Sequence, residues 1–174
     1  MKYLFKIFVF VSTLNIALAI TMATAIAGTP ELKPYTGNIK HPALILNDLK
    51  GKTHDLSQYK NQVVLVQFWA TYCAPCRKEM PSMNRLQNKL KGKNFKILAV
   101  DMAEETDDVL AFVKEVKPEF TILLDTDGTY IQQWKVFAAP ANFIIGKDGK
   151  IKYTLYGGVE WDSDTIVKQL TELM

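Results

Sequence analysis

The chain has 174 residues, of which 48% are hydrophobic, and its 21 basic and 18 acidic residues give a formal net charge of +3. A chain of this length can form one domain with a full hydrophobic core. The near balance of charge excludes the strongly basic surface that nucleic-acid binding requires, so no nucleic-acid partner is expected.

The first 27 residues differ in composition from the rest of the chain. Lys2 and Lys6 precede a stretch without charge from Ile7 to Ala27, and small residues near its end have the spacing that signal peptidase recognises. About 20 uncharged residues are also enough to cross a bilayer. Residues 1–27 are therefore predicted to be a signal peptide or a membrane anchor, which in the second case would attach the protein to the membrane through residues 7–27. In both cases the rest of the chain is expected in the periplasm or another exported compartment.

After a polar, proline-bearing linker over residues 28–38, segments of strand and helix character alternate over one domain, residues 39–174. Short apolar runs rich in β-branched residues indicate strands, and apolar residues repeated every three to four positions indicate helices. Turn signals at Lys50–Lys52 and Lys147–Lys150 indicate two hairpins. The predicted strands are 43–46, 53–56, 63–69, 95–100, 120–124, 141–145 and 151–156, and the predicted helices are 75–90, 106–116, 128–134 and a last helix that starts at Asp162 or Ser163. This order indicates an α/β sandwich with a mixed central sheet.

The only two cysteines, Cys73 and Cys76, lie three residues apart at the junction between the predicted strand 63–69 and the helix that follows it. At a helix N-terminus the backbone N–H groups and the helix dipole favour a thiolate, so Cys73 is predicted to be the nucleophile. Cys76, one turn further along, would be the resolving thiol that attacks a mixed disulfide. The pair is therefore predicted to be a redox-active disulfide.

Two other interpretations of the cysteine pair have less support. A zinc site needs about four ligands, and the only histidines, His41 and His54, are not spaced as a second half-site. A purely structural disulfide that closes so short a loop would remove little chain entropy. Redox chemistry is preferred, with no metal and no cofactor expected.

The segment from Val66 to Pro81 reads VQFWATYCAPCRKEMP, and it resembles the active-site segment of the exported thioredoxin-like proteins of the TlpA/ResA type. The resemblance extends from about Ile39 to the C-terminus and includes Asp55–Ser57 and the segment 139–145. It implies a thioredoxin-like three-layer sandwich with a mixed central sheet, an N-terminal hairpin and an inserted helix–strand unit.

The resemblance also implies a substrate-binding set. The family proline that matches Pro140 is cis and lies against the cysteines, where the backbone of Ala139 would pair with an extended client segment. Trp69 and Tyr72 would form walls of the site, although core packing is an equally reasonable role for Trp69.

A third implication concerns the proton that the resolving thiol must lose. Ordinary thioredoxins carry a buried aspartate at the position of Gln67, and glutamine cannot act as a general base. In ResA-like members a glutamate after the next strand lies near the cysteines, and Glu104 occupies the matching position. Glu104 is therefore predicted to raise the thiol pKa values and to accept the proton of Cys76, the alternative being a solvated loop acid.

These features predict an exported thiol-disulfide oxidoreductase that reduces disulfides in client proteins. The resemblance implies that a membrane thiol-disulfide electron donor re-reduces it and that cytochrome c maturation is one pathway it serves. An oxidase or isomerase of oxidative folding is the main alternative, because about 30 mV corresponds to only ~1.4 kcal/mol for this two-electron couple. A peroxiredoxin-like peroxidase is disfavoured because residues 70–72 lack the expected proline and threonine pattern, and a copper-binding assembly module because no histidine follows His54.

Overall fold

A computed structural model describes residues 31–37 and 40–174 of the chain. The predicted signal peptide or anchor, residues 1–27, lies outside the described residues. Within them, no helix is both long enough and apolar enough to cross a membrane. The elements are β1 (Lys33–Pro34), β2 (Ile45–Asp48), β3 (Thr53–Asp55), the 3-10 helix η1 (Leu56–Tyr59), β4 (Val63–Trp69), α1 (Ala74–Lys89), β5 (Phe95–Met102), α2 (Thr106–Val116), β6 (Thr121–Asp125), α3 (Thr129–Gln133), β7 (Ala141–Ile145), β8 (Ile151–Tyr156) and α4 (Asp164–Glu172).

The strands form one mixed sheet in the order β1-β8-β7-β4-β5-β6-β2-β3. The three central strands β4, β5 and β6 are parallel, and the remaining pairs are antiparallel. The predicted hairpins are both present, as β2–β3 and β7–β8. The predicted helix–strand unit is α2–β6, which adds a parallel strand beside β5. The mixed α/β sandwich that the sequence predicted is confirmed.

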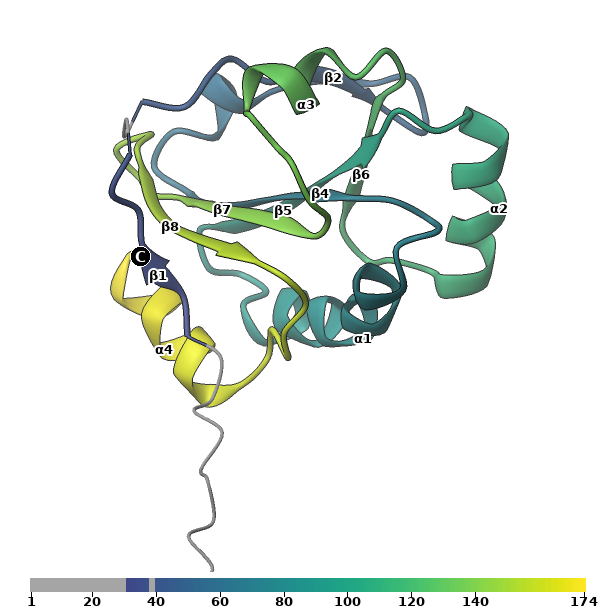
Figure 1. The fold of residues 1–174 in the computed structure, drawn as a ribbon. Helices are drawn as coiled ribbons and strands as arrows, with labels where there is room; N and C mark the ends of the chain where they lie inside the picture. Colours follow the sequence, from purple (N-terminus) through teal and green to yellow (C-terminus); the bar gives the residue numbers. More distant parts are fainter. Residues whose placement is uncertain (1–30, 38–39) are drawn as a thin grey trace, which may run out of the picture.

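Helices cover both faces of this sheet (Figure 1). On one face, α1 and α4 pack against β4 and β5 through apolar residues that include Met83, Leu86 and Leu170. Helix α2 joins this face through Val109 and Phe112. On the opposite face, α3 and the residue after it, Trp134, pack against the other side of β4. Every residue of β4 is buried because helices cover both of its faces, as its unbroken apolar run predicted.

The segment before β2 differs from the linker that the sequence predicted for residues 28–38. Lys33 and Pro34 pair with Thr154 and Tyr153 of β8 as an edge strand. Leu32 is buried in the core below α4, and its N–H donates to Gln169 Oε1 at 3.1 Å. Proline is tolerated in an edge strand because one side of that strand needs no donor. The linker assignment is wrong for this part of the segment, which belongs to the domain.

Candidate active site

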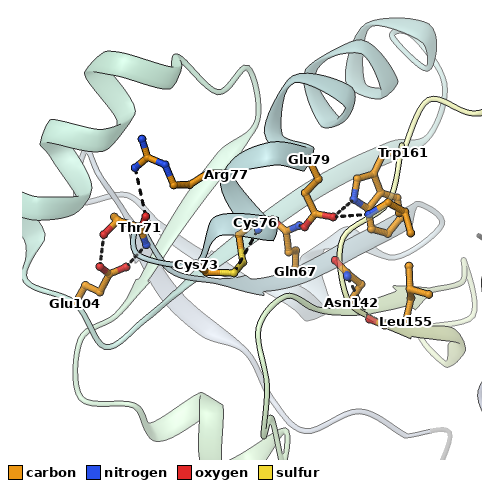
Figure 2. Close-up of a disulfide and its surroundings, with 11 residues drawn as sticks. Gln67, Thr71, Cys73, Cys76, Arg77, Glu79, Glu104, Asn142, Leu155 and Trp161 are labelled. Carbon is orange, nitrogen blue, oxygen red and sulfur yellow. Dashed lines mark hydrogen bonds between the residues drawn. A yellow bond between two sulfur atoms is a disulfide. The ribbon is translucent and has the colours of Figure 1, made fainter.

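Cys73 and Cys76 form a disulfide at the first turn of α1 (Figure 2). Cys73 is the residue that caps the helix, and its Sγ accepts the N–H of Cys76 at 3.3 Å. Pro75 occupies the first helical turn, where its missing N–H removes no helical hydrogen bond. Cys73 is 8% exposed and Cys76 is completely buried. Of the two sulfurs, that of Cys73 is therefore the one nearer to solvent, and its role as nucleophile stays a prediction.

The loop before the disulfide holds Cys73 at the carboxyl ends of β4 and β5. The Cys73 N–H donates to Ala70 O at 3.2 Å, and this hydrogen bond closes a turn directly after β4. The Arg77 guanidinium donates to Thr71 O at 3.3 Å and also lies over the Phe112 ring. The chain therefore leaves the sheet and enters the helix within four residues, with the cysteines at the rim of the sheet.

The Ala139–Pro140 peptide bond is cis, as the resemblance implied. Strand β7 runs antiparallel to β4, with Ala141 opposite Phe68, so residues 139 and 140 lie beside the carboxyl end of β4. Ala139 packs against the cluster that contains both cysteines. The structure thus brings together the predicted redox pair and the predicted client-pairing segment, which are more than 60 residues apart in the sequence.

The two aromatic residues that were predicted to form walls of the site have different surroundings. Trp69 is completely buried and packs on Phe112 with the ring centroids 5.0 Å apart. Since its ring has no exposed surface, Trp69 belongs to the core beneath the disulfide, and its placement in the substrate-binding set is corrected. Tyr72, directly before Cys73, is 76% exposed and is free to contact a client.

A carboxyl group that the sequence analysis did not single out lies in the interior next to this site. Glu79 is buried on α1, where its Oε2 accepts the Val159 N–H and the Trp161 indole N–H, each at 3.1 Å. Its Oε1 accepts the Gln67 amide at 2.5 Å. Figure 2 shows this network as part of the surroundings of the disulfide. Burial raises the pKa of Glu79 to about 8, and the hydrogen bonds from Val159 and Trp161 oppose that rise. The folded protein therefore favours the protonated form of this carboxyl group more than water does.

A signal for Glu79 was present in the sequence. The apolar residues Met80 and Met83 mark the face of α1 that packs on the sheet, and Glu79 lies next to that face. It also follows Cys76 by three positions, and side chains three apart on a helix are neighbours. An acid on the inward side of a helix is costly unless it is neutral or paired, so its position alone should have marked it as unusual.

Glu104, the predicted proton acceptor, contacts the loop before the cysteines. Its carboxylate accepts the Thr71 N–H at 2.6 Å and the Thr71 hydroxyl at 2.5 Å. Among the described residues it has no hydrogen bond with either sulfur, so its role in accepting the proton of Cys76 stays a prediction. What the geometry shows is a carboxylate that holds the backbone two residues before Cys73.

Asp101 supports Glu104 from the end of β5. Asp101 is buried opposite Trp69 in the sheet, and its Oδ2 accepts the Glu104 N–H at 3.1 Å. Burial, followed by the nearby Glu104 carboxyl group, raises the pKa of Asp101 well above its ordinary range. Asp101 therefore holds the backbone of Glu104, whose carboxylate in turn holds Thr71.

A pocket of about 350 Å³ opens beside the disulfide. It lies between the start of α1 and the segment that follows β8, and its lining is mainly apolar. The lining residues are Pro75, Lys78, Glu79, Gly158, Val159 and Glu160. Since Pro75 stands between the two cysteines, a group in this pocket would lie next to the redox pair.

Comparison with known proteins supports this chemistry. Residues 38–154 match the AhpC/TSA family. The chain is 41% identical over 130 residues to thiol-disulfide oxidoreductase ResA of Bacillus thuringiensis subsp. konkukian, which covers 74% of each protein. It is 34% identical over 116 residues to ResA of Bacillus subtilis, over 67% of this chain and 65% of that protein.

Solved structures show the same fold. A crystal structure from Chlorobium tepidum, described as a candidate thiol:disulfide interchange protein DsbE, superposes with a TM-score of 0.73 at 31% identity and covers 82% of this chain and 99% of that one. The exposed lipoprotein thioredoxin of Streptococcus pneumoniae strain TIGR4 has a TM-score of 0.67 at 27% identity, over 76% of this chain and all of that one. The thioredoxin-like fold is confirmed. The chain belongs to the AhpC/TSA family and, within it, is a thiol-disulfide oxidoreductase of the ResA type with its redox pair at Cys73 and Cys76.

Proposed function

We propose that this oxidoreductase works as a reductase of client protein disulfides in an exported compartment. The observation that carries the proposal is the asymmetry of the pair, in which Cys73, at a helix N-terminus, keeps 8% of its surface exposed and Cys76 is completely buried. An accessible nucleophile and a protected resolving thiol are what a two-step exchange with a protein disulfide requires.

In the reduced protein, the Cys73 thiolate attacks one sulfur of the client disulfide, and the second client sulfur leaves as a thiolate. The product is a mixed disulfide between Cys73 and the client. Cys76 then loses its proton and attacks Cys73 Sγ, which forms the Cys73–Cys76 disulfide and releases the first client sulfur. Two electrons pass from the pair to the client, and two protons convert the client sulfurs to thiols. Glu79 and Glu104 are the two carboxyl groups next to the site that could exchange these protons.

The setting of the reaction is also part of the proposal. The composition of residues 1–27 supports export, with either cleavage or anchoring at the membrane. The similar S. pneumoniae protein is described as an exposed lipoprotein, which is consistent with such a location. Re-reduction of Cys73–Cys76 would then come from a membrane thiol-disulfide donor, and cytochrome c maturation is one client pathway that the TlpA/ResA resemblance implies.

The direction of electron flow is tested by equilibrating the purified domain with dithiothreitol or glutathione buffers and counting free thiols. We expect a potential nearer to the thioredoxin value of about −270 mV than to the strong-oxidant value of about −120 mV. A value above roughly −180 mV would place the pair among isomerases and oxidases. The reductase assignment would then give way to a role in oxidative folding.

A further inference from the structure

Large exposed hydrophobic side chains gather around the redox site. In residues 31–37 and 40–174, the well-exposed ones are Ile45, Tyr72, Phe137 and Tyr156. Tyr72 precedes Cys73 directly, and Phe137 lies two residues before Ala139. Tyr156 is opposite Ala141 in the sheet. Only Ile45, on β2 toward the far edge of the sheet, is remote from the site.

Phe137 and Tyr156 form what we call the aromatic shelf. Their rings stack with centroids 4.4 Å apart and an angle of 20° between the planes. Phe137 is 80% exposed and Tyr156 is 38% exposed. The Tyr156 ring also meets Phe143 of the core edge to face, at 6.5 Å. The shelf is thus an apolar surface that the core holds in place, although Phe137 itself contributes little buried area to the fold.

The aromatic shelf is continuous with the redox site. The Gly157 N–H, directly after the shelf, donates to Pro140 O at 2.9 Å. The next residue, Gly158, packs so closely on α1 that a side-chain Cβ there would lie 3.1 Å from Pro75 O. Residues 156–158 therefore connect the shelf both to Pro140 and to the proline between the cysteines.

The surface between the shelf and the disulfide is formed by uncharged residues, and Lys78 and Glu160 border it at the pocket beside Pro75. Its exposed residues are Ala74, Pro75, Ala138, Gly157 and Gly158. A client that reaches Cys73 must cover part of this surface. Apolar side chains gain free energy when they leave water against such a surface, whereas charged ones lose hydration without finding a partner.

We propose that the aromatic shelf binds an aromatic or branched aliphatic side chain of the client, about two residues from the client cysteine that Cys73 attacks. The inference rests on the proposed function. A client strand paired with the Ala139 backbone advances about 3.3 Å per residue, and its side chains two apart point to the same face. Phe137 lies two residues before Ala139 in an irregular segment, and the Gly157 N–H joins the end of the shelf to Pro140 O, so the shelf lies within reach of that client position.

The test uses two peptides, each closed into a ring by an intramolecular disulfide. The peptides differ only at the two positions that lie two residues outside the ring, one on each side. One peptide carries Phe at both of these positions, and the other carries Ser. The reduced protein is freed of reductant and mixed with each peptide, and the second-order rate constant for peptide reduction is measured. We expect the wild type to reduce the Phe peptide about tenfold faster than the Ser peptide, the effect of one aromatic contact. Phe137→Ala should bring the ratio of the two rate constants close to one. Ile45→Ala, which removes an exposed apolar side chain elsewhere, should keep the wild-type ratio.

Each result bears on a different statement. Equal rate constants for the two peptides in the wild type, or an unchanged ratio in Phe137→Ala, would overturn the shelf assignment and leave the proposed reductase intact. If the wild type reduces neither of the peptides nor oxidised glutathione, the proposed function is wrong, and the inference falls with it. A concentration-dependent dimer that Phe137→Ala abolishes, with no preference between the peptides, would assign the shelf to a second copy of the chain instead.

Discussion

The Glu79 carboxyl group accepts a hydrogen bond from the Gln67 amide, with Gln67 on the central strand β4 and Glu79 on the helix that begins at the redox disulfide. This contact places a buried carboxyl group with a raised pKa beside a residue that cannot titrate. A thioredoxin-like domain that lacks an ionisable residue at position 67 therefore still has a buried acid next to its redox pair, contributed by α1.

Replacing Glu79 should change how the stability of the oxidised protein depends on pH. The pKa of Glu79 is about 8 in the folded protein, whereas the ordinary value for a glutamate is 4.5. Between these values the unfolded chain releases a proton that the folded protein retains, so the free energy of unfolding falls as the pH rises. Between pH 5 and pH 8 we expect the free energy of unfolding of the wild type to fall by about 3 kcal/mol more than that of Glu79→Gln. Urea unfolding at both pH values measures this.

The control for Glu79 is Glu105→Gln, because Glu105 is an exposed acid at the start of α2, outside the Glu79 network. It should keep the wild-type pH dependence. If the free energy of unfolding changes with pH in the same way for the wild type and Glu79→Gln, Glu79 ionises in the folded state as it does in the unfolded state.

Cys73 should react before Cys76 when the reduced protein is treated with iodoacetamide at neutral pH. The reasons are the small exposed area of Cys73 and its place at the N-terminus of α1, against the complete burial of Cys76. Mass spectrometry of the labelled peptide identifies the site. Cys76→Ser should accumulate mixed disulfides with clients, and Cys73→Ser should accumulate few. Preferential labelling of Cys76 would reverse the two roles.

Glu104→Gln should alter the pH dependence of Cys73 alkylation, and Glu105→Gln should not. Glu104 holds both the N–H and the hydroxyl of Thr71, so it acts on the loop two residues before the nucleophile. Thr71→Val distinguishes whether Glu104 acts by positioning the loop or by accepting a proton. If Glu104 works by positioning the loop, Thr71→Val should reproduce part of its effect, and if it works as a proton acceptor, Thr71→Val should have little effect. Wild-type behaviour in both Glu104→Gln and Thr71→Val would make Glu104 a surface acid.

Leu32→Ala should destabilise the protein by about 2–4 kcal/mol, because Leu32 is fully packed in the core below α4. Lys33→Ala, at the exposed neighbouring position, should change the free energy of unfolding by less than about 0.5 kcal/mol. Denaturant unfolding of both variants makes the comparison. Equal, small effects would mean that this segment is the loose arm that the sequence suggested.

The sequence alone determined most of the secondary-structure elements and the position of the cysteine pair, because both depend on local patterns. The buried run of β4 and the spacing of Cys73 and Cys76 at a helix start are visible within about 15 residues. The strand β1 was not predictable in this way. Its two residues have no strand pattern of their own, and they pair with residues about 120 positions away.

Only the tertiary structure decided the protonation of Glu79 and the shape of the client surface. The donors that surround Glu79 come from Gln67, Val159 and Trp161, and two of them are 80 and 82 positions away. A pKa depends on burial and on such partners, neither of which can be read from a glutamate in a helix. In the same way, Phe137 belongs to no pattern in the sequence, and it forms one surface with Tyr156, at the end of β8, because β8 pairs with β7 directly after Pro140.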